Sequence, residues 1–472
     1  MITEKGEAYP PALRWTKRLA AGYALLLVAI VIAHLAWSHI ANGRLQAMVD
    51  AAHAAGEPIL VDDFKRPPIP DDENAVTYIR VAERSIALRN DVDWFDLDSI
   101  ATGGRDPNDF NVPAALASPK EIEEANKTPL AAIRTARNLK HIDWQLPFQH
   151  PATYILLPDL NNVRSVTRLL AIAAVAAHER GDDAAAIEYL RDILFLSRSL
   201  GQQPFLVSDL VANGCTSLAV SAWRWILPDL AVASDTTTAP LNAASEAQVR
   251  AFIVELLDDK DISDGVRQAV LGERMVQTDF AVWIGEKQLV TRPLFRLSAM
   301  RMARRMSAVL SARDSATLPA ARRTLPPNQR SIYSSPASRA THALELYLSP
   351  SLGRYAETSY RIRADRRMAA LATAMRLYQL DHTGNRPKTL DELVPQYLAA
   401  VPADPMTEGG ILRYHVSPPA YLYSLGANGK DDSAGGWRPG SATNTNYRLR
   451  DLDIPFMLDR PAAPSTREAG DE

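Results

Sequence analysis

The clearest feature of the hydrophobic pattern is an uninterrupted apolar run near the amino end. Residues 19–40 contain no aspartate, glutamate, lysine or arginine. About 20 such residues are enough to cross a hydrocarbon core of ~30 Å as a helix. Four basic residues precede the run, whereas a single arginine follows it before the next acidic residue. The pattern therefore predicts a transmembrane anchor at 19–40, with residues 1–18 in the cytoplasm and everything after about Ala41 outside it.

A cleaved signal peptide is the alternative interpretation of this run. The apolar stretch is longer than the hydrophobic part of a signal peptide, which has about 7–15 residues, and no small-x-small cleavage site follows it cleanly. We therefore favour an uncleaved signal anchor. This predicts a single-pass protein of the inner (cytoplasmic) membrane, in contact with the lipid bilayer through residues 19–40, with an extracytoplasmic, periplasmic body.

The part outside the membrane has mainly helical patterns. Residues 41–160 read as a helical and loop-like lead-in, in which Asp71 or Asp72 caps a helix that begins near Glu73. Residues 161–310 read as an α-helical domain, because apolar positions recur at helical spacing between polar breaks at 180–182 and 201–203.

One pair of these predicted helices has a repeat-like pattern. Ala174, Gly181, Ala185 and Tyr189 resemble the positions of a tetratricopeptide-like helical pair, in which alanines allow close approach and a glycine turns the chain. A self-standing solenoid needs about three such units. We therefore expect an α-helical bundle with a single tetratricopeptide-like pair.

A basic segment follows the helical domain. Residues 288–330 carry nine arginines and one acid, Asp314. Arginine is the usual cation throughout this chain, so we expect a solvated helical face here rather than a lipid or nucleic-acid site. Residues 311–351, rich in serine, alanine and proline, read as a linker.

The last part of the chain changes from helical to mixed patterning. Residues 361–380 predict one helix, and Thr389 with Glu392 form the signature of a capping box. Short strand-like pieces follow at 411–416, 420–426 and 451–456. We expect a small α+β domain at 352–456 and a disordered tail at 457–472.

Spaced residues in this part match the motif pattern of a known family. The matching positions are Tyr378, Asp381, Gly384, Pro387, Leu390, Leu393, Tyr397, Leu398, Pro402, Asp404, Pro405, Tyr414, Tyr421, Tyr423, Ser424, Gly426, Asn428 and Gly429. Their order resembles the C-terminal domain of the type II secretion major pseudopilin. The chain as a whole also resembles uncharacterised single-anchor proteins of planctomycete-type bacteria. The anchor lies more than 300 residues before this domain, so filament assembly does not follow from the resemblance.

The pseudopilin resemblance implies a calcium site. Carried over to this chain, the ligands would be the backbone oxygen of Leu425, the side chain of Asn428 and an acid before the final strand, Asp453 or Asp451. Asp431 and Asp432 are further candidates within the same loop. Calcium takes six to eight oxygen ligands, which a loop of carbonyls and carboxylates supplies. The alternative is a polar hairpin loop that uses Asn-Gly turn chemistry and binds no ion.

Composition and motifs narrow the function. The 472 residues are 47% hydrophobic and 23% charged, with a net charge of −3, which is typical of a globular protein and argues against a nucleic-acid partner. A single cysteine, Cys215, excludes an internal disulfide. His178 and Glu179 begin a zinc-protease pattern, but Asp182 stands where the second histidine is needed.

We therefore expect a membrane-anchored scaffold or binding protein of the cell envelope, related to secretion, rather than an enzyme. The alternative is an extracytoplasmic hydrolase with its site in the helical domain. Two or more carboxylates or histidines that converge in a deep cleft would favour the hydrolase.

Overall fold

The fold comes from a computed structural model of the chain. It describes residues 11–87, 119–233, 242–325, 345, 352–432 and 453–459. Within these ranges the chain is mainly helical, and a three-stranded sheet lies near the C-terminus.

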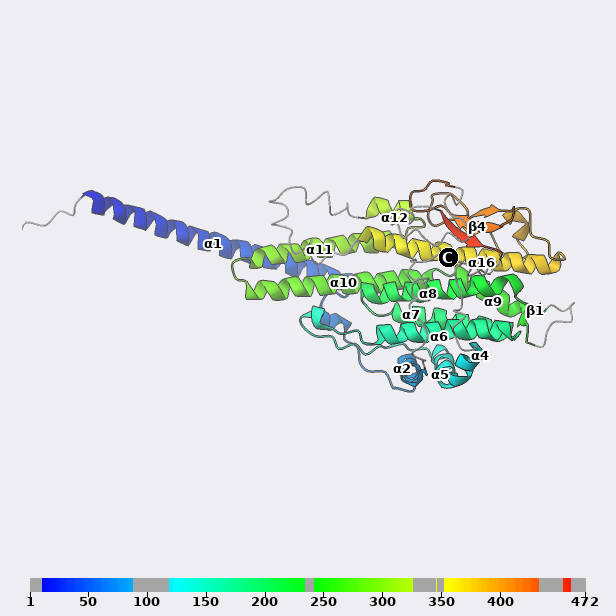
Figure 1. The fold of residues 1–472 in the computed structure, drawn as a ribbon. Coiled ribbons are helices and arrows are strands. Elements are labelled where there is room, and N and C mark those ends of the chain that lie inside the picture. Colours follow the sequence, from blue (N-terminus) through cyan, green and yellow to red (C-terminus); the bar gives the residue numbers. More distant parts are fainter. Residues whose placement is uncertain are drawn as a thin grey trace, which may run out of the picture.

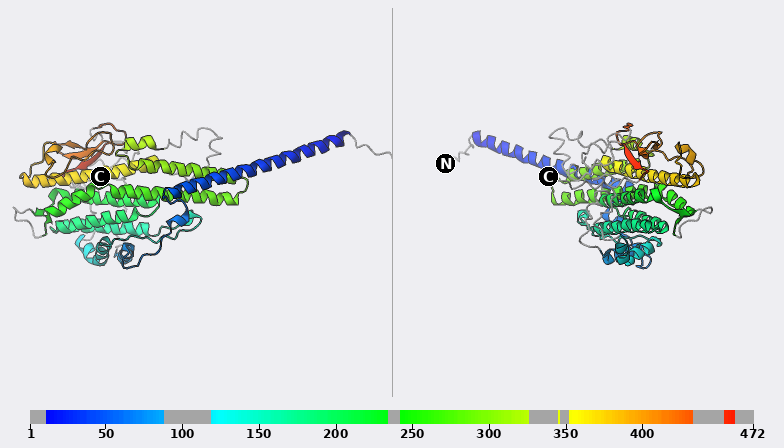
Figure 2. Two further views of the ribbon diagram at one scale, coloured as in Figure 1. Left: turned by 180° about the vertical axis from the view of Figure 1, so that it is seen from behind. Right: turned by 45° about the vertical axis from the view of Figure 1, so that its right-hand side comes forward.

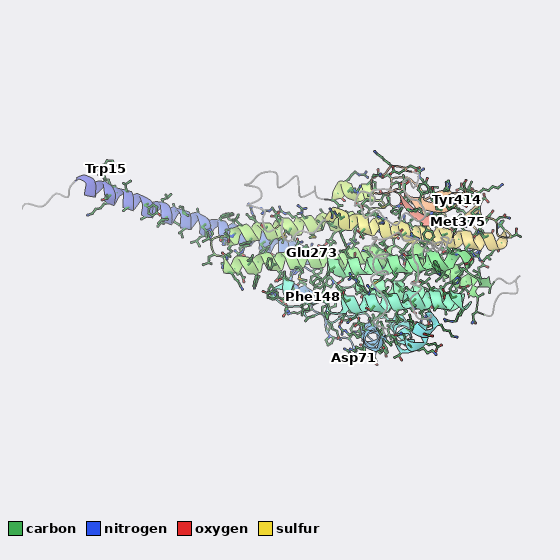
Figure 3. The ribbon with its side chains drawn as sticks, viewed as in Figure 1. Trp15, Asp71, Phe148, Glu273, Met375 and Tyr414 are labelled. Carbon is green, nitrogen blue, oxygen red and sulfur yellow. The ribbon has the colours of Figure 1, made fainter. Side chains whose placement is uncertain are left out.

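The predicted membrane segment lies within one continuous helix, α1 (Pro11–Ala54). Most of its side chains within 19–40 are exposed, and this part projects away from the body with Trp15 near its far end (Figures 1 and 3). Its C-terminal part is buried at Leu45, which packs against α11 (Arg292–Ala312). Among the described residues, α1 is the one helix long and apolar enough to cross a membrane, as a single-pass anchor or a signal sequence does.

The other helices stack in layers to form the body (Figure 1). An outer layer contains α2 (Ala75–Ser85), α4 (Pro119–Ala125) and α5 (Lys127–Arg137), and α6 (Asp159–Glu179) and α7 (Asp183–Leu200) cover it. The next layer contains α8 (Leu206–Ile226), α9 (Glu246–Leu257) and α10 (Lys260–Lys287), and α16 (Leu352–Asp381) lies with α11 on its other side. Figure 2 shows the same order of layers from two further directions.

Short elements connect these helices. They are the 3-10 turns η1 (Val61–Phe64), η2 (Ala152–Tyr154) and η3 (Leu227–Asp229), and the parallel pair β1 (Val232–Ala233) and β2 (Ala244–Ser245).

The turn between α6 and α7 occurs at the predicted break. Gly181 has a φ of 82°, a left-handed conformation that glycine adopts without steric cost. Asp182 then caps α7, because its carboxylate accepts a hydrogen bond from the Ala185 N–H at 3.1 Å. Ala174 is completely buried beside this hairpin. The two expected helices and their turn are therefore confirmed, whereas their tetratricopeptide-like character stays a prediction.

The C-terminal part combines α16 with a three-stranded sheet. The turn η4 (Leu390–Leu393) follows the helix, and the Glu392 carboxylate accepts a hydrogen bond from the Thr389 N–H at 3.1 Å, as the capping-box pattern predicts. The strands β3 (Arg413–His415), β4 (Tyr421–Ser424) and β5 (Ile454–Met457) pair antiparallel in the order β3-β4-β5. This sheet packs on α16, so an α+β arrangement is present.

The helical bundle and the C-terminal part share one hydrophobic core. The Trp223 ring of α8 lies edge-on to Phe252 of α9 with ring centroids 5.0 Å apart. The indole N–H of Trp223 donates to the Thr373 hydroxyl of α16 at 2.8 Å. The expected boundary at residue 352 therefore does not separate two cores, because the buried face of α16 completes the bundle.

Three local predictions differ from the structure. The second helix begins at Ala75, because Asn74 rather than an aspartate caps it by accepting a bond from the Val76 N–H. The expected linker contains α12 (Leu318–Thr324), which forms because the side chain of Leu318 is buried. Residues 457–459, expected in a disordered tail, are part of the fold, since Met457 ends β5 and Asp459 is paired with Arg386. Residues 88–118 of the lead-in, the stretch 433–452 with the candidate ligand Asp451, and the residues after 459 lie outside the described part of the chain.

Candidate functional site

A cavity of about 300 Å³ in the described body opens beside α10. Its walls come from η1 and the residues after it, the loop 142–148, the turn between α7 and α8, and the middle of α10. The lining combines three aromatic rings, four glutamine amides, two bases and one acid. These residues are Phe64, Trp144 and Phe148; Gln145, Gln202, Gln203 and Gln268; Lys65 and Arg66; and Asp143.

The loop 142–148 is held in place by hydrogen bonds between its backbone and the side chains of α2 and its cap, and by the indole of Trp144. Asn74 donates through its amide to the Asp143 carbonyl at 2.8 Å and accepts from the Asp143 N–H at 3.0 Å. The Trp144 indole donates to the Ser199 carbonyl at the end of α7, also at 2.8 Å. Arg80 donates to the Trp144 carbonyl. Because these bonds fix the loop from both sides, this wall of the cavity is formed before any ligand arrives.

The opposite wall depends on two glycines of α10. A β-carbon on Gly272 would overlap the carbonyl oxygen of Pro204, and a β-carbon on Gly265 would press on the Asp209 carboxylate. Gln268 lies between the two glycines in the sequence and lines the cavity. The α7–α8 turn therefore rests directly on the α10 backbone, and this contact sets the position of the Gln268 amide.

The residues that follow α1 connect the cavity to the apolar helix. Arg274 of α10 donates to the Glu57 carboxylate at 2.6 Å and to the Pro58 carbonyl at 2.9 Å. Asp63 accepts from the N–H groups of Ile59 and Leu60 at 2.9 and 2.8 Å. Burial acts to raise the pKa of Asp63, but these N–H groups together with His53 bring that pKa below its usual value. The ionised carboxylate therefore stabilises the turn that places Phe64 and Lys65 at the cavity.

The chemistry of the cavity fits binding. Glutamine amides donate and accept hydrogen bonds, and Arg66 adds positive charge beside the Lys65–Asp62 ion pair at 2.6 Å, so a ligand with both kinds of hydrogen-bonding group and some negative charge is complementary. The carboxylate of Asp143 accepts from the Gln145 N–H at 2.9 Å. Within the cavity lining, Asp143 is the one acid and no histidine is present.

Four of the residues predicted to bind calcium lie at 425–432, and Asp453 directly precedes β5. Their polar groups are bonded to one another and to other residues of the chain. Asp431 forms an ion pair with Arg413 at 2.8 Å. Asn428 turns its amide N–H₂ toward Asp432 at 2.8 Å, and the Asp453 carboxylate accepts from the Asp432 N–H at 3.1 Å. As arranged, this donor set does not fit an ion, because Asp431 already faces a cation and Asn428 presents its donor.

The fifth predicted ligand, Leu425, lies beside a buried aspartate. The N–H of Leu425 donates to Asp404 at 2.9 Å, and the Ser424 hydroxyl donates to the same carboxylate at 2.7 Å. These motif positions therefore hold the end of β4 in place. In the part of the chain that the structure describes, no three histidine, cysteine, aspartate or glutamate side chains come together as a metal-binding group.

The cavity was not predicted from the sequence. Its glutamines come from three separate segments at 145, 202–203 and 268, so no spacing along the chain signals that they meet. The weak signal available was the pair of α10 glycines at 265 and 272, seven residues apart on one helix face.

Comparison with known proteins assigns the chain to no family: no family model matches it, and neither a curated protein nor a solved structure is similar to it. The pseudopilin resemblance of residues 352–456 therefore stays a prediction from the sequence. The features of the fold that bear on function are the long apolar helix α1 and the cavity beside α10.

Proposed function

We propose that this protein is a single-pass membrane protein whose extracytoplasmic body binds a partly acidic polypeptide segment of an envelope protein. The observation that carries the proposal is the continuity of α1. Its exposed apolar part passes without a break into a part that packs on the body through Leu45. A helix built in this way holds the body at a fixed position beside a membrane. The basic residues before the apolar run favour an N-terminus in the cytoplasm.

The cavity supports a binding role for the body. A volume of about 300 Å³ is at the lower end of the range for ligand sites, ~300–1,000 Å³, and fits a short segment of a chain rather than a whole domain. An extended polypeptide presents alternating N–H and C=O groups that match the Gln145, Gln202 and Gln268 amides. Arg66 complements an acidic side chain of that segment, and Lys65, which pairs with Asp62 at 2.6 Å, lies beside it.

The lining favours this role over the hydrolase alternative. Acid–base hydrolysis needs at least two titratable groups that converge on the reacting bond. The described lining offers Asp143 as its single acid, and that carboxylate is engaged by the Gln145 N–H.

Two measurements on cells and on their isolated membranes test the proposal. Alkaline extraction should leave the full-length chain in the membrane pellet, and added protease should digest the body only from the extracytoplasmic side. An intact chain free in the cytosol would overturn the proposal.

The binding role is tested by photo-crosslinking. A photoreactive residue that replaces Gln268 should capture one defined envelope protein, and the charge reversal Lys65→Glu with Arg66→Glu should abolish the adduct. The same photoreactive residue at Val254, an exposed apolar position on α9 outside the cavity lining, is the matched control. Equal adducts from both positions, or an adduct that survives the charge reversal, would contradict a binding role for the cavity.

A further inference from the structure

The hairpin of α10 and α11 reaches the membrane segment of α1. Its tip, residues 288–291, joins the two helices. The His34 Nε2 atom lies 3.0 Å from the Leu289 carbonyl oxygen. One turn further along α1, Arg296 donates to the Ser38 carbonyl at 3.4 Å. Figures 1 and 2 show the end of this hairpin beside α1.

The depth of this contact follows from helix geometry. His34 precedes the end of the apolar run at Ile40 by six residues, and a helix rises 1.5 Å per residue. The Leu289 carbonyl therefore lies about 9 Å inside that end of the run. The 22 residues of the run span about 33 Å as a helix, close to the ~30 Å of a hydrocarbon core, so with α1 across a bilayer the tip of the hairpin reaches into the acyl-chain region just below the headgroups.

The side chains of the tip match that environment. Leu289 and Val290 are 68% and 80% exposed, an apolar pair that in water contributes nothing to stability. Around them lie groups that membrane interfaces favour. The Lys287 ammonium lies 3.9 Å from the centre of the Trp283 ring, and Arg292 follows the tip at the start of α11. Long basic side chains reach from an apolar layer to lipid headgroups, and tryptophan concentrates at the interface.

We propose that the tip of the α10–α11 hairpin is embedded in the bilayer leaflet next to the body, as a second membrane contact beside α1. The partner is the lipid itself: acyl chains around Leu289 and Val290, and anionic headgroups around Lys287 and Arg292. The proposal depends on the proposed function, because α1 must lie in the membrane. It adds that the body is fixed in orientation against the lipid surface rather than tethered by one helix.

This contact also gives a role to part of the basic segment that begins at residue 288. The sequence predicts a solvated arginine face for this segment. In the structure, however, Arg296 donates a hydrogen bond to the Ser38 carbonyl of α1, within the apolar run. The His34 side chain gains a polar partner in the Leu289 carbonyl, which reduces the cost of placing an imidazole at this depth.

The test uses the full-length chain in vesicles of phosphatidylcholine and phosphatidylglycerol. Nitroxide labels are attached to single added cysteines in Val290→Cys, Val31→Cys and Val254→Cys. Cys215 stays in place because it is buried, and unlabelled wild type is the blank. Spin relaxation by oxygen, which concentrates in lipid, is compared with relaxation by a nickel chelate, which stays in water. Circular dichroism checks that each variant is folded.

We expect the label at 290 to lose nickel accessibility, as the label in the anchor at 31 does, while the label at 254 keeps it. A label at 290 that is as accessible to nickel as the label at 254, together with a lipid-embedded label at 31, would overturn the hairpin contact and leave the anchor intact. Nickel access at all three positions would overturn both the hairpin contact and the proposed function.

Discussion

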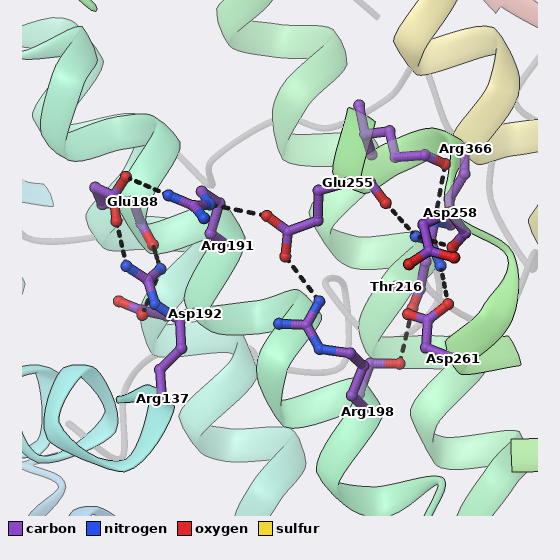
Figure 4. A network of polar contacts seen from close by, with 12 residues as sticks. Arg137, Glu188, Arg191, Asp192, Arg198, Thr216, Glu255, Asp258, Asp261 and Arg366 are labelled. Atoms are coloured by element: carbon purple, nitrogen blue, oxygen red, sulfur yellow. Dashed lines mark hydrogen bonds and ion pairs between the residues drawn. The ribbon is translucent and has the colours of Figure 1, made fainter. Parts of the chain in front are cut away.

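The guanidinium of Arg366, in the middle of α16, lies 2.7 Å from the carboxylate of Asp261 at the start of α10. The same guanidinium donates to the backbone carbonyls of Glu255, Leu256 and Asp258, and its side chain is 1% exposed. Figure 4 shows these contacts at one end of a network that continues across α7 and α5. One buried cation thus satisfies carbonyls at the end of α9, where a helix leaves C=O groups unpaired, and pairs with a carboxylate in the first turn of α10.

Replacing this arginine should destabilise the whole body. Arg366→Leu leaves three carbonyls and the Asp261 carboxylate without their donor, and removal of one partner from a buried pair costs about 3–5 kcal/mol. Chemical denaturation of the full-length chain in detergent measures the effect. The control is Arg323→Leu, which removes an exposed pair with Glu408 and should leave the free energy of unfolding nearly unchanged, because solvent screens such pairs. Equal losses in the two variants would contradict this role for Arg366.

The close contact of α10 with the α7–α8 turn makes a second prediction. Gly272→Ala places a methyl group on the Pro204 carbonyl oxygen, so we expect a loss of about 2 kcal/mol or more. Gly214→Ala, on α8, meets no atom within 4 Å and should gain about 0.5–1 kcal/mol from helix propensity. Thermal unfolding of both variants gives the comparison. A shift of both midpoints in the same direction would show that the Pro204 contact does not limit the packing.

The elements that the sequence predicted are those with local causes. The apolar run within α1, the Gly181 turn and the Thr389 capping box each depend on a few neighbouring residues. The common core was not predicted, because the Trp223–Thr373 bond joins residues 150 positions apart. The many charged residues at 361–380 also gave no sign that this helix is buried. Arg366 can be buried because it donates to backbone carbonyls of α9, and the sequence pattern does not show that contact.

The candidate site was less predictable than the fold. The predicted calcium ligands are neighbours along the chain, and a resemblance can identify such a set. The glutamines of the cavity come from distant segments, and nothing in the identity of Gln145 or Gln268 distinguishes them from surface glutamines. The hairpin contact with α1 was missed for the same reason, because it joins residues more than 250 positions apart.

Calcium is tested directly by a melting curve. The pseudopilin resemblance predicts a higher midpoint in calcium than in a chelator, because a ligand of the native state raises stability. From the contacts in the loop we instead expect an unchanged midpoint, since Asp431 is paired with Arg413. The full-length chain is used because α16 belongs to the common core. A calcium-dependent rise that Asp432→Asn removes would favour the site that the resemblance implies.

The last prediction concerns the pH dependence of stability at Glu83 of α2. Burial, together with the nearby Asp159 carboxylate, raises the pKa of Glu83 to about 8. The folded protein therefore retains a proton at Glu83 that the unfolded chain releases above its ordinary pKa, near 4.5. Stability is then greatest below that value and falls as the pH rises toward 8, by on the order of 2–4 kcal/mol.

Glu83→Gln carries no titrating group, so its free energy of unfolding should change less between pH 5 and pH 8 than that of the wild type. Denaturant titrations at several pH values measure the difference. Glu179→Gln, at an exposed position at the end of α6, should keep the wild-type slope. If Glu83→Gln also keeps that slope, the pH dependence arises from other groups and Glu83 is ionised in the folded protein.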